Sequence, residues 1–178
     1  SLRVFGVLEL LDDAGAGSPG RLEWTPSGGT ITASGLENNG EVLLNNGAST
    51  LRMTVLASLV NHGTFTNNTD GAIFSVYGNF SNFGTFKTDN PANDDSFTVR
   101  GSWLNDGGTI TWGSGTVSLS GSFGDITTNG QPFNNLYIDP LSSGSGADYF
   151  ATDALEVTGS LTIDDGGILR VANSLSFG

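Results

Sequence analysis

A short motif recurs along the sequence at nearly constant spacing. It reads apolar-x-Asn-x-Gly, followed closely by a β-branched or aromatic residue, and its four copies occupy 36–43, 59–66, 80–87 and 103–110. The asparagines of these copies are separated by 23, 21 and 23 residues, and they are Asn38, Asn61, Asn82 and Asn105. A period of roughly 20–50 residues indicates a repeat architecture, in which each unit packs on its neighbours. The repeat therefore favours a stack of similar units.

A second short stretch follows each copy, in which apolar and polar residues alternate. These stretches occupy 51–55, 72–76, 97–99 and 117–119. Alternation with period two predicts β-strands with one buried face, and the Gly, Asn and Asp between them predict turns. A unit of about 22 residues cannot bury its own apolar face, so neighbouring units must stack. The sequence therefore predicts one all-β domain over 1–178, a right-handed parallel β-helix (β-solenoid) with coils of about 21–23 residues.

The repeated asparagines have a specific role in such a solenoid. Asn tolerates the left-handed backbone region and bonds to its own backbone, so it suits a corner between strands. Stacked at one corner, the four asparagines would form a ladder of amides that satisfies buried polar groups of the turn. One apolar column is expected beside this ladder, formed by Val42, Phe65, Phe86 and Ile110. An antiparallel β-sandwich would also suit many short strands, but it gives no reason for the regular recurrence of Asn.

The charge of the chain limits the classes of partner. Six basic residues stand against 18 acidic ones, so the formal net charge is −12. We expect no binding to nucleic acid or to anionic membranes, because the chain has too few cations to neutralise phosphates. No run of 18 or more apolar residues is present, so membrane insertion is not expected. A polar composition dominated by Gly, Asn, Ser and Thr, with almost no Lys, favours an extracellular or cell-surface location.

One segment carries a family resemblance. The residues GTVSLSGSFGDITTNGQPFNNLYIDP, at 115–140, resemble a segment of large bacterial and archaeal surface proteins, in which a GTVTF-like strand leads to an F-x-N-L-x-I strand. The N-x-G-x-F units resemble the parallel β-helix repeats of autotransporter passenger domains and other adhesin-like proteins. The resemblance spans 30–178 and implies an extracellular stalk, fibre or adhesin. It assigns no catalytic residue.

An acidic loop is the candidate metal site. The stretch TDNPANDD, at 88–95, offers oxygen ligands of the kind that Ca²⁺ prefers, and the candidate ligands are Asp89, Asn93, Asp94 and Asp95. The loop lacks the spacing of an EF-hand and of the Gly-rich nonapeptide repeats that bind Ca²⁺. A solvated bulge between strands is the favoured interpretation. Calcium thus stays a candidate, and no other cofactor is expected.

Other side chains are candidates for contacts with glycans. Trp112 follows an alternating strand beside Gly113, and Tyr137 lies in a later strand, so both are candidate sugar-stacking residues. Asn67 and Asn79 match the pattern for N-glycosylation, which is short and often fortuitous. His62, the single histidine, is interpreted as a turn residue because the sequence offers it no second His or Cys as a partner.

Two hypotheses for function follow. The basic residues fall at scattered phases of the repeat, so we expect no enzyme activity; they are Arg3, Arg21, Arg52, Lys87, Arg100 and Arg170. The first hypothesis is a structural β-solenoid, a segment of a longer protein or a fibre subunit that self-associates through uncapped ends, where unpaired strand edges invite pairing. The second is a carbohydrate-binding adhesin or a polysaccharide-active β-helix protein.

Overall fold

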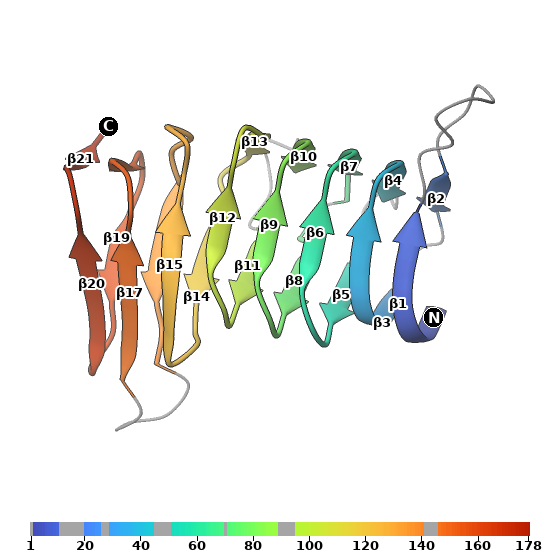
Figure 1. Ribbon diagram of the computed structural model, residues 1–178, viewed down its shortest axis with the longest axis horizontal. Helices are drawn as coiled ribbons and strands as arrows, with labels where there is room; N and C mark the ends of the chain where they lie inside the picture. Colours follow the sequence, from blue (N-terminus) through green and yellow to red (C-terminus); the bar gives the residue numbers. More distant parts are fainter. Residues whose placement is uncertain are drawn as a thin grey trace.

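The computed structural model is an all-β protein whose strands wind into a parallel β-solenoid of about six turns. It describes residues 2–10, 20–25, 29–44, 51–69, 71–88, 95–140 and 146–178, and these contain 21 strands and no helix. Within these ranges there is accordingly no helix of the length and apolarity needed to cross a membrane. The fold class predicted from the repeat is confirmed, and the two ends of the chain lie at opposite ends of the row of strands (Figure 1).

The strands form three faces of parallel strands. The first face consists of the initial parts of β1 (Leu2–Leu10) and β3 (Gly29–Asn38), with β5 (Leu51–Val55), β8 (Ile73–Val76), β11 (Ser96–Val99), β14 (Thr116–Leu119), β16 (Asn135–Ile138) and β19 (Leu161–Ile163). The second consists of the later parts of β1 and β3, with β6 (Leu59–Asn61), β9 (Phe80–Asn82), β12 (Trp103–Asn105), β15 (Phe123–Thr127), β17 (Ala147–Ala151) and β20 (Gly167–Val171). The third contains β2 (Arg21–Trp24), β4 (Glu41–Leu44), β7 (Thr64–Asn67), β10 (Thr85–Thr88) and β13 (Thr109–Trp112), and in later coils β18 (Leu155–Val157) and β21 (Leu175–Phe177).

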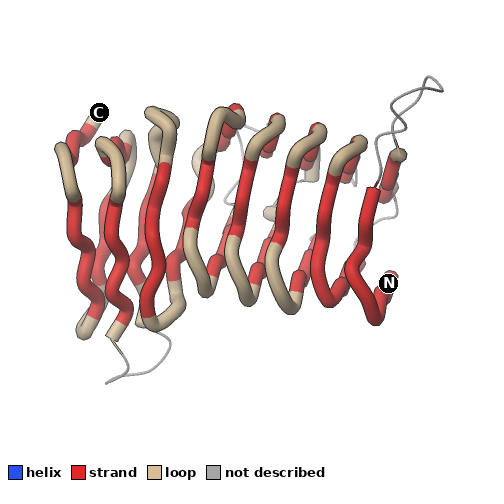
Figure 2. Tube along the Cα trace, viewed as in Figure 1, coloured by secondary structure: helices blue, strands red, loops and turns tan. Residues whose placement is uncertain are grey.

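Pairing is in register from coil to coil, so equivalent residues of the repeat lie in continuous files. Phe65 of β7 pairs with Val42 of β4 and with Phe86 of β10. Phe86 pairs in turn with Ile110 of β13. These four residues are the apolar column that the repeat predicted, and all of them are buried. Figure 2 shows the same regularity in the turns, which follow one another along the axis between the strands.

Aromatic rings fill the centre of the middle coils. Phe65 and Phe86 are stacked with ring centroids 4.5 Å apart, and Phe80 and Trp103 are 4.4 Å apart. Phe97 of the first face meets Phe86 of the third at 5.6 Å, so the rings connect different faces across the core. Buried aromatic pairs in stacked or edge-on arrangements stabilise a core beyond their area alone. The repeat thus places one large ring after another along the axis.

A column of glycines lies at the corner between the second and third faces. A Cβ atom at Gly63 would run into the carbonyl oxygen of Gly40, and one at Gly84 would run into that of Gly63. Successive coils therefore approach so closely here that any side chain would push them apart. This close approach explains why Gly stands two residues after Asn in the first three copies of the motif, and why Gly108, three residues after Asn105, takes that place in the fourth.

Candidate functional sites on the solenoid

The four repeated asparagines lie on one corner of the solenoid, here called the asparagine corner. Nδ2 of Asn38 donates to Oδ1 of Asn61 at 2.7 Å, and Nδ2 of Asn61 donates to Oδ1 of Asn82 at 2.7 Å. Nδ2 of Asn82 then donates to Oδ1 of Asn105 at 2.8 Å, and all four side chains are fully buried. Asn61 and Asn82 thereby both accept and donate, so a continuous chain of hydrogen bonds runs along the axis from Asn38 to Asn105.

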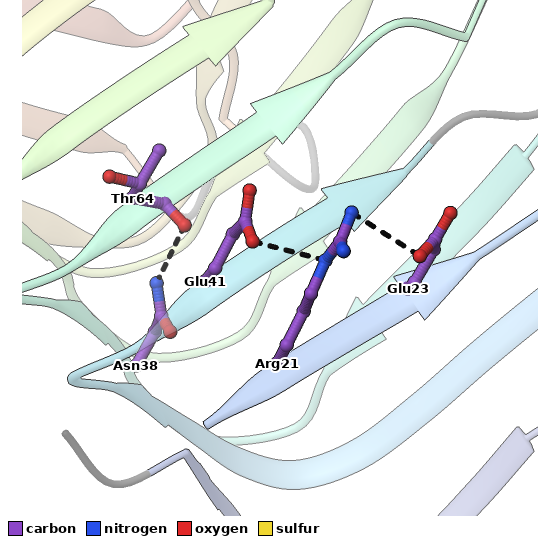
Figure 3. A network of polar contacts seen from close by, with 5 residues as sticks. All are labelled: Arg21, Glu23, Asn38, Glu41 and Thr64. Carbon is purple, nitrogen blue, oxygen red and sulfur yellow. Dashed lines mark hydrogen bonds and ion pairs between the residues drawn. The ribbon is translucent and has the colours of Figure 1, made fainter. Parts of the chain in front are cut away.

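The amides also donate hydrogen bonds to the backbone of the third-face strand in the next coil. Nδ2 of Asn38 donates to the carbonyl oxygen of Thr64 at 3.1 Å, as Figure 3 shows. Nδ2 of Asn61 donates to the carbonyl oxygen of Thr85 at 3.0 Å. Because buried backbone oxygens are costly when unpaired, these bonds satisfy the corner as well as joining the coils.

The corner continues through two residues that the motif did not single out. Nδ2 of Asn105 donates to the carbonyl oxygen of Thr128 at 3.0 Å. The backbone N and the Oγ1 of Thr128 then donate to Oδ2 of Asp153, at 2.9 and 3.0 Å. The spacings from Asn105 to Thr128 and from Thr128 to Asp153 are 23 and 25 residues. This spacing, close to that of the motif, is the feature of the sequence that could have identified Thr128 and Asp153 as corner residues, although neither is Asn.

Of the four proposed ligands in the candidate metal loop, the structure describes one, Asp95. Asp89, Asn93 and Asp94 lie outside the described residues. Asp95 is 3% exposed, and its carboxylate accepts hydrogen bonds from Nδ2 of Asn67 at 3.0 Å and from the backbone N of Ala72 at 2.8 Å. This carboxylate therefore joins two coils. Within the described ranges no group of three His, Cys, Asp or Glu side chains is placed to hold a metal ion.

The two candidate glycosylation sites differ in exposure. Asn67 is fully buried, and its amide donates to the carbonyl oxygen of Thr69 at 3.2 Å as well as to Asp95. The structure corrects the expectation for Asn67, because a buried amide in these bonds is inaccessible in the folded chain. Asn79 is exposed, and its Oδ1 accepts a hydrogen bond from the backbone N of Ser102 at 2.9 Å.

The two aromatic residues proposed to contact glycans lie on different faces and do not come together. Trp112 is the last residue of β13 rather than a turn residue, and its partly buried ring lies 5.8 Å from Phe86 and 5.9 Å from Trp103. Tyr137 lies on β16 of the first face, and its hydroxyl donates to Oδ2 of Asp164 at 2.8 Å. This hydrogen bond raises the pKa of Tyr137 and lowers the pKa of Asp164.

Charged and aromatic side chains also link neighbouring coils on the surface. Nε of Arg21 lies 3.0 Å from Oε2 of Glu41 in the next coil, and its Nη2 lies 3.3 Å from Oε2 of Glu23 (Figure 3). His62 stacks on Phe83 with ring centroids 4.7 Å apart, which agrees with a turn residue whose neighbour along the axis is another turn residue. Such exposed contacts add little stability each.

The last coil leaves its inward-facing apolar residues exposed. Ile163, Leu175 and Phe177 are 44%, 40% and 61% exposed. Their counterparts one coil earlier include Ile138 and Leu155, which are fully buried. The outer edges of β19, β20 and β21 have no partner strand in the described part of the chain. The coil therefore presents an apolar cross-section framed by backbone groups that can accept another strand.

We compared the chain with models of protein families, with curated proteins and with solved structures, and found no match in any of the three comparisons.

Proposed function

We propose that the chain is a non-enzymatic structural protein, the building block of an extracellular fibre or stalk on a cell surface. The observation that carries the proposal is the in-register stacking of equivalent residues along the rod, which a further coil with the same repeat can extend. The resemblance to adhesin-like and autotransporter repeats supports the same class of protein. The proposed role is mechanical, because the stacked files of residues make the rod stiff.

The end coil is suited to a partner with the same repeat. A further coil would pair with the free edges of β19, β20 and β21 and would cover Ile163, Leu175 and Phe177. Such a coil can belong to the same chain or to a second copy. If it belongs to a second copy, the contact joins unlike ends and does not close, so it generates a filament.

The first face of the solenoid contrasts with its end. From β3 onward, one outward file of this face carries a hydroxyl group in each described coil, after Arg3 on β1, and it consists of Thr32, Thr54, Ser75, Thr98, Ser118, Tyr137 and Thr162. Hydroxyl side chains and a net charge of −12 keep this surface hydrated and make the rods repel one another. The first face therefore disfavours lateral association of the rods, as a single-file fibre requires.

The test measures self-association of the 178-residue chain by sedimentation velocity and electron microscopy. We expect concentration-dependent single-file oligomers, and we expect Phe177→Asp to abolish them by placing a charge on the end coil. Phe123→Asp is the matched control, because Phe123 is 79% exposed but lies on the side of the rod. A chain that stays monomeric at high concentration, or one whose oligomers survive Phe177→Asp unchanged, contradicts the proposal.

A further inference from the structure

We propose that the outer surface of the second face, at β15, β17 and β20, binds a neutral glycan. The site consists of Phe123, Asp125, Asp148, Phe150 and Arg170. It lies on the side of the rod, apart from the end coil, and involves neither Trp112 nor Tyr137. This inference is independent of the proposed fibre role.

The site arises because the second face becomes wider in the later coils. β6, β9 and β12 have three residues each, whereas β15, β17 and β20 have five. The added length creates two outward-facing files beside the one that runs through Leu104 and Thr127. Phe123, Asp148 and Ile168 form one file, and Asp125, Phe150 and Arg170 form the other. Apolar and charged side chains consequently alternate both along and across the face.

Two aromatic rings are available on this surface. Phe123 is 79% exposed and Phe150 is 41% exposed, and they occupy diagonal positions on neighbouring strands. The two residues line a depression of about 360 Å³ together with the three charged residues, Ser102 and Gly124. With about 4.8 Å between strands and about 3.3 Å per residue, diagonal neighbours lie roughly 8 Å apart, within the span of a single sugar ring and its substituents. Exposed apolar groups that lie near one another and are bordered by polar ones mark interaction sites.

The polar groups of the depression are held in place yet retain capacity for a ligand. Nε and Nη2 of Arg170 donate to Oδ1 and Oδ2 of Asp148, both at 2.9 Å. Two of the five N–H groups of the guanidinium are used in these bonds, and the bidentate geometry fixes its plane. The backbone N of Asp125 donates to Oγ of Ser102 at 3.0 Å, while its carboxylate has no hydrogen bond to any residue that the structure describes.

This combination of groups fits a sugar. The C–H face of a pyranose ring is apolar and packs on a phenyl ring, while its hydroxyls need acceptors such as Asp125 and donors such as Arg170. A lysine side chain would use the carboxylates and the rings but would be repelled by the guanidinium. An acidic glycan would be repelled by Asp125 and by the net charge of −12. The open shape of the depression suits one unit of an extended glycan.

The depression beside Tyr137 is a weaker candidate for a glycan. It measures about 240 Å³, and Asn135 and Ser160 lie on its wall. The Asn135 amide donates to the carbonyl oxygen of Ser114, and its Oδ1 accepts bonds from the N and Oγ of Ser160. The Tyr137 hydroxyl is bonded to Asp164. Since these groups are occupied within the protein, the second face offers the better set of partners.

Affinity gel electrophoresis of the folded chain tests the proposal. The gels contain one of four soluble neutral polysaccharides: hydroxyethyl cellulose, glycol chitin, xylan or mannan. We expect at least one to retard the chain, and we expect Phe123→Ala and Phe150→Ala each to weaken that retardation about tenfold. Phe5→Ala is the matched control, because Phe5 is 91% exposed on β1, far from the site. Circular dichroism confirms that each variant is folded.

Each outcome decides for or against the site. Retardation that is lost in Phe123→Ala and kept in Phe5→Ala supports it, and a parallel loss in Asp125→Ala and Arg170→Ala assigns the polar contacts. No retardation by any of the four polysaccharides overturns the proposal, as does retardation that Phe123→Ala leaves unchanged. Binding of a poly-lysine peptide that salt removes and Asp125→Asn abolishes, without retardation by polysaccharide, would assign the surface to a cationic partner instead.

Discussion

The coils from β5 to β13 differ from the coils after them, although both follow the same winding. In the earlier coils, each asparagine of the corner bonds to the next, and the third face is a continuous ladder that includes β7, β10 and β13. In the later coils, Thr128 and Asp153 occupy the corner. Among the described strands β18 does not pair with β13, and Phe133 contributes one isolated bridge to Val157.

The break in the third face has a local cause. Asn129 and Gly130 both have positive φ, at 52° and 71°, and the backbone N of Gln131 donates to the carbonyl oxygen of Thr128 at 3.1 Å. Two central residues with positive φ define a tight turn of type I′, which folds the chain back on itself. The segment that follows therefore reaches the third face at Phe133 alone. The chain therefore keeps the same winding with other residues at the asparagine corner. A continuous ladder of strands on the third face, in contrast, requires the regular motif.

The largest expected effect concerns the aromatic core, which is dense in the earlier coils and is reduced to Phe133 and Tyr149 in the later ones. Phe86→Ala removes a ring that meets Phe65, Phe80 and Phe97, so we expect a loss of about 4 kcal/mol in the free energy of unfolding. Phe133→Ala, in the later coils, should cost about 3 kcal/mol. Urea denaturation followed by circular dichroism measures both. Equal losses would mean that the aromatic stack adds nothing beyond burial.

The second largest loss of stability is expected at the glycine column, which lies in the earlier coils. Gly84→Ala places a Cβ against the carbonyl oxygens of Gly63 and His62, so we expect a loss of about 3 kcal/mol. Gly130→Ala meets no atom within 4 Å and should cost about 1 kcal/mol, because of its positive φ. Thermal unfolding of both variants gives the comparison. A Gly84→Ala variant as stable as Gly130→Ala would show that the coils can separate at this corner.

The amide chain itself should give a smaller effect. Asn82→Ala leaves Nδ2 of Asn61 without its side-chain acceptor and Oδ1 of Asn105 without its donor in a buried site, so we expect a loss of about 2–3 kcal/mol. Thr128→Ala removes a corner residue of the later coils and should cost about 1 kcal/mol. Chemical denaturation measures the difference. The amide ladder would lose its special role if the two losses were equal.

The smallest expected effect is electrostatic and confined to the later coils. Tyr137→Phe removes the phenol that bonds to Asp164, so the pKa of Asp164 should rise toward its ordinary value, while the bond from the backbone N of Asp165 persists. The pKa of Asp164 is lower in the folded chain, so this carboxylate contributes stability above its unfolded pKa of about 4. That contribution is lost as the pH falls through the folded pKa. NMR titration of the carboxyl carbon measures the shift, and an unchanged pKa would contradict the bond.

The sequence predicts the winding because the period of the motif and the alternation within strands act in every coil. It identifies Asn38, Asn61, Asn82 and Asn105 as equivalent, and the structure stacks them. It does not identify Thr128 and Asp153, because a hydroxyl and a carboxylate can replace an amide at a corner without resembling it in sequence.

The lateral site could not be predicted either. Phe123, Phe150 and Arg170 are far apart in the chain and meet only through strand register. The alternation along β7 places Asn67 on the same inward side as Phe65, but it does not show that the amide meets Asp95 on a different coil. Contacts between coils of this kind depend on how many residues each turn contains, which composition and local patterns do not specify.

Because each described strand pairs only with strands of adjacent coils, the coils are connected in series along the axis. A coil of about 22 residues occupies roughly 4.8 Å of axis but contains about 75 Å of extended chain. Tension applied along the axis would therefore release length one coil at a time. A rod built in this way would absorb a sudden pull by lengthening while its remaining coils stay folded.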